Sequence, residues 1–496
     1  MNNTGKTIAK NASVLMVSQL ITWSLTLTLM IFLPRILGAT AVGQFHLARS
    51  IWAIAGVFAT FGMDMFLTKE ISRNPGKLSD LFGVILVFRA FVFALSFGFV
   101  ALYIQFAGYD VETINVIYII GLSGFFVLFS GACRAALQGL ERMEYISLAD
   151  IIGKTVMTVG GLIFLFLGKG IVVISVVTIG ASLVNLLIQG FYLKRLQPIH
   201  FHFNWQATKL VIRSSFPYFL VSVFAVIYIQ LDIVIISLLT DEEVVGWYAA
   251  ADGLFGTLLF IPSIFMTAVF PALTRLHVEE DEDNMLGKLM SKSFDFLALI
   301  SIPMGLGVMV IANSIVVLLF GEEFINSGPV LATMGIVLIL TYQNMLLGRF
   351  IISIDRQNTW TIIMAVATVA TIPLDILLIP WCDKMFGNGA IGAALAFAIT
   401  EGAMMITGLY ILPKGLLGWN NAWTAARALV AGLIMAAAVW FLRDFFIAIP
   451  VIIGGVVYLL LIIIMRVIPN EDWVMFGNLA QRLLARLRGR KTKSVG

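Results

Sequence analysis

Ionisable side chains lie deep inside long apolar segments of this sequence, where a charge needs a partner or a polar cavity. A charged side chain at the centre of a membrane helix costs about 2.5–3.5 kcal/mol on insertion scales. Cations suit a diphosphate or another anionic group, and carboxylates beside hydroxyls suit Na⁺ or H⁺. The first half carries the cations and the second half the carboxylates: Arg49, Arg89 and Lys154, then Asp232, Asp252, Asp375 and Glu401, which follows Thr400.

Each of these charges also has a structural interpretation. Lys154 follows Asp150 by four residues, so the two can form an ion pair on one face of a helix. Arg89 can extend its stem to the inner headgroups. Arg49 has no carboxylate three or four residues away, which favours a role with substrate or with another helix. The cations can also pair with the carboxylates as a gate between the two halves.

The composition requires a membrane as the solvent for the elements that carry these charges. Hydrophobic residues make up 60% of the 496 residues, charged residues only 12%, and the mean hydropathy is +0.98. A soluble domain contains about 25% charged residues. The two cysteines and four histidines show neither a disulfide framework nor the spacing of a metal site. We therefore expect an integral membrane protein whose only cofactor is a coupling ion.

Continuous apolar runs of about 20 residues predict the membrane helices. The first run is too long for the core of a signal peptide, so it is interpreted as a membrane helix. The sequence predicts an all-α polytopic membrane protein with about fourteen transmembrane helices, near residues 12–33, 43–62, 81–106, 113–133, 145–167, 171–193, 213–239, 244–270, 289–319, 329–353, 359–380, 389–411, 424–446 and 450–468.

The basic residues predict the orientation of these helices, because Lys and Arg gather in cytoplasmic loops. With both termini in the cytoplasm, the loops and tails on that side hold all but seven of the 32 basic residues. Three of the seven are the intramembrane cations, and the external four are Arg35, Lys169, Lys384 and Arg443. We expect a multi-pass protein of the cytoplasmic membrane.

An internal repeat divides the chain. "VGQFHLARSIW" at residues 42–52 matches "VGWYAAADGLF" at residues 245–255, and "GLERMEY" at 139–145 is echoed by "SIDRQNT" at 353–359. Helices 1–6 therefore correspond to helices 7–12, and an even number of helices gives both repeats the same orientation, as in parallel-repeat transporters. The predicted domains are a bundle at 1–200, a second bundle at 201–415, two extra helices at 416–470 and a tail at 471–496.

The tail combines apolar residues at helical spacing with a cluster of arginines and lysines. Such a basic amphipathic helix binds anionic lipids at the inner leaflet. We expect it to anchor the chain, and no feature points to nucleic acid as a partner.

Several stretches resemble the polysaccharide-biosynthesis flippases of the O-antigen (Wzx-like) branch of the MOP (multidrug/oligosaccharidyl-lipid/polysaccharide) superfamily. They run in the family's order over nearly the whole chain: "LPRILGATAVGQFHLA", "FGMDMFLTKEISRNPGK", "AALQGLERMEY", "IQLDIVIISLLTDEEVVGWYAAA", "IPMGLGVMVIANSIVVLLFGEEF" and "TIPLDILLIPWCDKMFGNGAIGAALAFAITEG".

The resemblance implies two six-helix bundles in a V shape around a cavity. It implies a polyprenyl-diphosphate-linked oligosaccharide as substrate, flipped from the inner to the outer leaflet by alternating access, and polysaccharide-assembly proteins as partners. In related lipid II flippases, arginines on the first two helices hold the diphosphate, and Arg35 and Arg49 stand at matching positions. The resemblance also implies a Na⁺ site at Asp232, Asp375 and Thr400, with Glu401 adjacent.

Other functions remain open. A lipid II flippase would carry similar cations, and an organic-cation exporter of the same superfamily would favour an anionic cavity with few buried cations. A membrane-embedded glycosyltransferase or polymerase would need catalytic groups in a sizeable external loop. All external loops expected here are short, so the sequence favours a transporter that is not an enzyme.

Overall fold

A computed structural model describes residues 2–197, 205–278, 285–413 and 415–467. These residues form α-helices, with a single 3₁₀ turn at Pro75–Lys77 and another at Glu322–Phe324, and no strand occurs among them. The helices are α1 (Asn2–Thr60), α2 (Met63–Arg73), α3 (Leu78–Ala107), α4 (Val111–Gly139), α5 (Met143–Phe166), α6 (Ile171–Leu196), α7 (Trp205–Leu239), α8 (Glu242–Leu258), α9 (Phe260–Val278), α10 (Met285–Phe320), α11 (Ser327–Ser353), α12 (Gln357–Phe386), α13 (Gly389–Ile411), α14 (Trp419–Trp440) and α15 (Ala448–Ile464).

The predicted all-α membrane fold is confirmed, with two changes in how the spans are divided. Within the described residues, 12 helical stretches are long and apolar enough to cross a membrane, and α15 is a shorter apolar helix. The first two predicted spans form the single helix α1, and the eighth is divided into α8 and α9. The predicted tail helix at 471–496 lies outside the described residues, so its contact with anionic lipids stays a prediction.

The first two spans join through a kink at Gly38 rather than through a loop. Gly38 has φ 79°, a left-handed conformation that only glycine adopts freely. The Glu323 carboxylate accepts a hydrogen bond of 2.9 Å from the Ala39 amide, which caps the helix that resumes after the kink. A Cβ on Gly38 would lie 2.3 Å from Glu323 Oε1, so the kink also requires glycine for space.

The break between α8 and α9 follows from Pro262. A proline has no N–H to bond the carbonyl four residues before it, which here is that of Leu258. The Tyr342 hydroxyl of α11 donates a hydrogen bond of 2.8 Å to this free carbonyl. A side chain from a neighbouring helix therefore stabilises the broken helix.

By their contacts, the helices group into two compact units. The first comprises Met1–Thr257, Ile315–Thr333 and Gln357–Met404, and the second comprises the remaining three segments: Leu258–Ser314, Met334–Arg356 and Met405–Gly496. In the first unit α7 packs on α1 and α12, although the sequence places α7 in the second repeat. Grouping by contact does not test the repeat relation, so the division at residues 200 and 201 stays a prediction.

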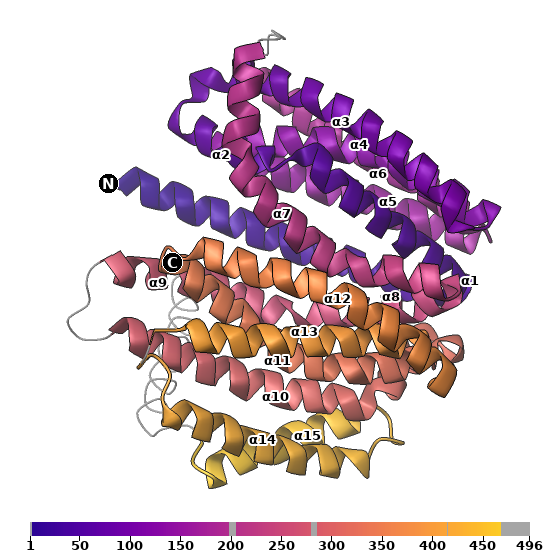
Figure 1. The fold of residues 1–496 in the computed structure, drawn as a ribbon, viewed down its shortest axis with the longest axis vertical. Coiled ribbons are helices and arrows are strands. Elements are labelled where there is room, and N and C mark those ends of the chain that lie inside the picture. The colour runs from indigo at the N-terminus through magenta and orange to yellow at the C-terminus, as the bar shows by residue number, and fades with distance from the viewer. Residues whose placement is uncertain (1, 198–204, 279–284, 414, 468–496) are drawn as a thin grey trace, which may run out of the picture. The chain divides into compact units, whose positions relative to one another are not determined.

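Four helices of the first unit, α3 to α6, run side by side (Figure 1). The Trp52 indole N–H of α1 donates a hydrogen bond of 2.7 Å to the Ile117 carbonyl of α4. The Trp52 ring covers Gly121 so closely that a Cβ there would lie 2.2 Å from the ring. This close packing fixes the rotation of α1, and so fixes the direction of its charged residues.

The glycines of the repeated "VG" dipeptide, Gly43 and Gly246, bring the two repeats into backbone contact. A Cβ on Gly43 of α1 would lie 1.9 Å from the Glu242 carbonyl oxygen, and a Cβ on Gly246 of α8 would lie 2.0 Å from that of Ala39. Only glycine permits so close a crossing of two helices. The repeated dipeptide therefore marks the point where its two copies meet.

The second unit joins the extra helices α14 and α15 to α10. The Asn421 amide of α14 donates hydrogen bonds to Asp295 Oδ1 (2.9 Å) and to Ser291 Oγ (2.7 Å). The Tyr458 hydroxyl of α15 donates one of 3.0 Å to the Leu299 carbonyl. Polar side chains inside apolar helices thus specify this attachment.

Candidate functional site

Arg49 of α1 and Lys154 of α5 form a pair of exposed cations in the first unit. Their side chains are exposed, and they lie near enough for their positive charges to act on each other. The Arg49 guanidinium lies 5.8 Å from the centre of the Phe45 ring. Neither cation has a carboxylate within ion-pair distance among the described residues. Two cations that act on each other and form no ion pair are suited to an anion, although the charge of Asp150 also acts on Lys154.

The ion pair expected between Asp150 and Lys154 does not form. Arg134 of α4 forms an ion pair with Asp150 Oδ2, and the Asn185 amide of α6 donates a hydrogen bond of 3.3 Å to Asp150 Oδ1. The Gln189 amide donates to Asn185 in turn, at 2.7 Å. Asp150 is bonded to partners on two other helices and forms no ion pair with Lys154, although its charge still acts on Lys154.

Arg89 of α3 is fully buried, so the proposed extension of its side chain to the headgroups is wrong. One guanidinium nitrogen lies 2.5 Å from Asp64 Oδ1 on α2, and another donates to the Leu128 carbonyl of α4. The Asp64 side chain is 39% exposed. Arg89 therefore holds three helices together through a charged partner that the sequence did not indicate.

Arg35 is engaged with the protein backbone. Its guanidinium donates to the Leu318 carbonyl in the last turn of α10. The last carbonyls of a helix have no partners within it, and a cation there also interacts favourably with the helix dipole. In this structure Arg35 stabilises a helix end next to the Gly38 kink, and its predicted contact with a diphosphate stays a prediction.

Asp232 and Asp375 bring two buried carboxyl groups together from α7 and α12. Both side chains are at most 4% exposed, and their carboxyl groups lie within hydrogen-bonding reach of each other. The Tyr248 hydroxyl of α8 donates a hydrogen bond of 2.7 Å to Asp232 Oδ2. Asp232 Oδ1 and both Asp375 oxygens have no hydrogen-bond donor. Buried oxygens without donors fit a proton shared between the carboxyls or a bound cation.

Tyr228 of α7 lies one turn before Asp232 and links this carboxyl pair to Thr400 and Glu401 of α13. The Tyr228 hydroxyl donates a hydrogen bond of 2.9 Å to Glu401 Oε1 and lies 3.3 Å from Thr400 Oγ1. The Thr400 hydroxyl itself donates to carbonyls of its own helix. The carboxyl pair fits the predicted cation site, whereas Thr400 contacts Tyr228 in this structure.

Asp252 belongs with the other carboxylates and not with Arg49. Its charge acts on Asp232 and on Tyr248. No ion pair among the described residues joins Arg49, Arg89 or Lys154 to Asp232, Asp252 or Asp375. These cations and carboxylates are therefore not paired with each other in this structure, and the gate interpretation stays a prediction.

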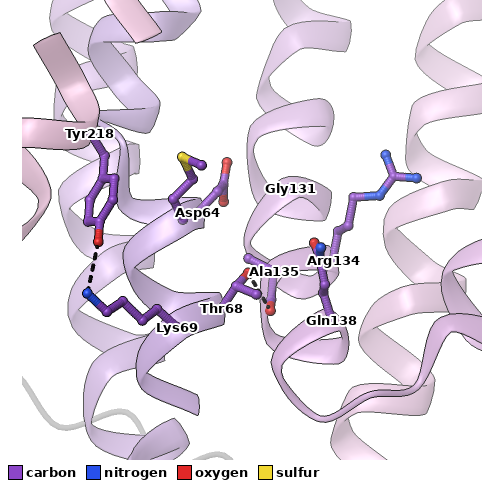
Figure 2. A pocket seen from close by; sticks show the side chains of 9 residues that line it. Asp64, Thr68, Lys69, Gly131, Arg134, Ala135, Gln138 and Tyr218 are labelled. Atoms are coloured by element: carbon purple, nitrogen blue, oxygen red, sulfur yellow. Dashed lines mark hydrogen bonds between the residues drawn. The ribbon is translucent and has the colours of Figure 1, made fainter. Parts of the chain in front are cut away.

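A pocket of about 460 Å³ opens next to the Asp64–Arg89 pair. Asp64 and Lys69 enter it from α2, and Arg134 and Gln138 lie along α4 (Figure 2). Tyr218 of α7 closes one side, and its hydroxyl lies 3.3 Å from Lys69 Nζ. Sequence reasoning did not single out Asp64, Lys69, Gln138 or Tyr218 as site residues.

The model of one protein family, described as polysaccharide biosynthesis protein, matches residues 8–277, more than half of the chain. The chain belongs to this family. It is 24% identical over 389 residues to the probable low-salt glycan biosynthesis flippase Agl15 of Haloferax volcanii. That match covers 74% of this chain and 76% of the relative. The family expected from the sequence is confirmed.

Solved structures show the same fold. The lipid II flippase MurJ in an inward closed conformation superposes with a TM-score of 0.75, at 16% identity, over 92% of this chain and 99% of its own. An inward-facing multidrug resistance MATE family transporter of the MOP superfamily has a TM-score of 0.65 at 15% identity, over 81% of this chain and 97% of its own. At such low identity the likeness shows the fold alone, and it confirms the expected all-α membrane fold.

Proposed function

We propose that this polysaccharide biosynthesis family protein flips a polyprenyl-diphosphate-linked oligosaccharide from the inner to the outer leaflet of the cytoplasmic membrane. The family, the glycan flippase relative and the MurJ-like fold support a lipid-linked glycan as substrate. The observation that carries the proposal is the pair of free, exposed cations Arg49 and Lys154. A diphosphate needs several charge-assisted hydrogen bonds to replace its water, and these two side chains supply them.

Such a site lowers the barrier to crossing. An isolated charge moved from water into an apolar medium costs tens of kcal/mol, so an unaided diphosphate does not cross. Arg49 and Lys154 would replace water around the phosphates while the polyprenyl chain stays in the bilayer. The proposal does not assign this role to Arg35 or Arg89, because the Leu318 carbonyl and Asp64 already occupy their guanidinium groups.

The carboxyl pair of α7 and α12 would couple transport to an ion. Asp232 and Asp375 would hold Na⁺ or a shared proton, and the bound ion would neutralise two buried negative charges. Their three oxygens without donors support this role. Tyr248 orients Asp232, and Tyr228 links this pair to Glu401 and Thr400.

The predicted orientation, with both termini in the cytoplasm, places the larger polar loops on the side where the substrate is made. A lipid II flippase shares the required diphosphate chemistry, so only the headgroup separates it from the proposed function. An organic-cation exporter is disfavoured, because Arg49 and Lys154 would repel its substrate.

Reconstitution into liposomes tests the proposal. Lipid-linked oligosaccharide extracted from source cells is incorporated with the purified protein, and an impermeant reagent measures how fast its headgroup reaches the other leaflet. We expect the protein to accelerate this step, and Arg49→Ala with Lys154→Ala to reduce the rate at least tenfold. Lys169→Ala, which removes a loop lysine, serves as the matched control and keeps the rate. An unchanged rate in the Arg49 and Lys154 double variant would contradict the proposal.

A further inference from the structure

The pocket beside Asp64 has no role in binding the diphosphate as proposed above. Its charged and polar lining comes from three helices that the buried Arg89 and the Tyr218–Lys69 hydrogen bond hold in place. The pocket volume of about 460 Å³ lies within the range of sites for small organic ligands. Figure 2 shows Asp64 on the helix that also carries Lys69, with its side chain on the side of the helix that carries Gly131 and Arg134.

The lining combines a mostly apolar surface with a few donors and acceptors around an aromatic ring. Asp64 offers a partly exposed carboxylate as acceptor, while Lys69 and Arg134 offer donors. The Gln138 amide is exposed and has no side-chain partner among the described residues, so it has both a donor and an acceptor to offer. A site for a simple anion would not contain a carboxylate such as Asp64, which would repel the ligand. This mixture suits a neutral ligand with many hydroxyl groups, with the Tyr218 ring as an apolar face.

The position of the pocket relative to the cation pair indicates that its ligand can be attached to the group that these cations bind. Arg134, on the lining, is bonded to Asp150, and Lys154 follows Asp150 by one turn of α5. Four residues of helix rise by about 6 Å, which is comparable to the length of one phosphate or one sugar unit. A headgroup whose phosphates reach Lys154 and Arg49 can therefore place its next group near Arg134.

We propose that this pocket binds the sugar unit attached to the diphosphate of the lipid-linked substrate. The proposal rests on the proposed function, and it adds a second subsite that recognises the glycan. Asp64 and Gln138 bind sugar hydroxyls, and Tyr218 lies against the apolar face of the sugar ring. The cations Arg49 and Lys154 provide the affinity for diphosphate, which is common to all such substrates, and the pocket provides selectivity for the sugar.

Binding of short soluble analogues to the detergent-purified full chain tests this inference. The probes are farnesyl diphosphate and farnesyl diphosphate linked to glucose, galactose, N-acetylglucosamine or glucuronic acid. We expect at least one sugar-linked probe to bind about tenfold more tightly than farnesyl diphosphate. Gln138→Ala removes that tenfold gain and leaves farnesyl diphosphate binding within twofold, since a few sugar hydrogen bonds are lost. Lys69→Met repeats the test at a second lining residue, and Gln105→Ala, an exposed glutamine of α3 outside the pocket, leaves every affinity unchanged.

The outcomes separate the two proposals. Equal affinity for all five probes would overturn the sugar subsite, and so would a sugar-dependent gain that survives both pocket variants. An equal loss of affinity for all probes in Gln138→Ala and Lys69→Met would also overturn it, because the pocket would then bind the diphosphate. Farnesyl diphosphate binding that is absent, or is insensitive to Arg49→Ala with Lys154→Ala, would instead contradict the proposed diphosphate site.

Discussion

Asp64 is the only charged partner of a fully buried arginine among the described residues, so its removal has a predictable cost. In Asp64→Ala, Arg89 would keep one hydrogen bond, to the Leu128 carbonyl, and would lose its counter-charge. Breaking a buried ion pair costs about 3–5 kcal/mol, mostly from the charge left behind. The Asp64 side chain is 39% exposed and borders an open pocket, so water can reach part of the guanidinium. We therefore expect the lower end of that range, a loss of about 3 kcal/mol in the free energy of unfolding.

Removal of the arginine instead of the aspartate is predicted to cost less. Arg89→Met keeps most of the side-chain volume, and it leaves a carboxylate that water already contacts. We expect a loss of about 1–2 kcal/mol. Asp64→Ala with Arg89→Met removes both charges, so its cost should be close to that of Arg89→Met alone. The coupling energy of the cycle would then equal the cost of Asp64→Ala, about 3 kcal/mol.

Unfolding in mixed micelles of a mild detergent and SDS, followed by tryptophan fluorescence, measures these four free energies. A cost below 1 kcal/mol for Asp64→Ala, or additive single costs, would refute the argument from a buried uncompensated charge. Flipping by Arg89→Met, which keeps Asp64 in the pocket, separates structure from binding. A retained rate agrees with a structural role for Arg89, and a rate lost while the protein stays folded would return Arg89 to the diphosphate site.

Further predictions follow from single contacts. Gly246→Ala should lower the free energy of unfolding by about 1–3 kcal/mol because its Cβ would overlap the Ala39 carbonyl, whereas Gly256→Ala on the same helix has open space and should be neutral or stabilising. Tyr342→Phe leaves the Leu258 carbonyl without its donor, and unfolding measurements should show a loss of about 1–3 kcal/mol. Asp375→Asn should abolish the stimulation of flipping by a Na⁺ or H⁺ gradient; stimulation that persists would place the coupling ion elsewhere.

The sequence predicted the features that depend on local pattern. Apolar runs located the membrane helices, and the "VG" repeat marked a related position in each half. The seven charges predicted within membrane helices all lie in helices, whereas Arg35, predicted in an external loop, lies inside α1. Each of these signals is contained in one short segment of the sequence. A membrane helix needs about 20 apolar residues, and a charged residue within such a segment is easily recognised.

Partners on separate helices were beyond such reasoning. Arg89 is 25 residues from Asp64, and Asp150 is 16 and 35 residues from Arg134 and Asn185. Which faces of two helices meet depends on their rotation and crossing, which the packing of Trp52 on Gly121 and similar contacts determine. Tyr228 and Tyr248 each precede an aspartate by four residues, a spacing that would pair each hydroxyl with a carboxylate on its own helix. In the structure Tyr228 donates to Glu401 and Tyr248 donates to Asp232, so this local signal marks the tyrosines but gives the wrong partners.

The two copies of the repeated frame show why one residue is the same and another differs. Gly43 and Gly246 meet at the crossing of α1 and α8, where any side chain on either would overlap a backbone carbonyl, so both copies need glycine. Arg49 and Asp252, further along the same helices, form no ion pair with each other, and each lies near charges of its own sign. Like charges gathered in this way favour ligands of the opposite sign over a pair that closes the protein. The contact between the two copies therefore requires glycine in both, while the charged positions differ in sign, as the proposed binding of an anion by one copy and of a cation by the other requires.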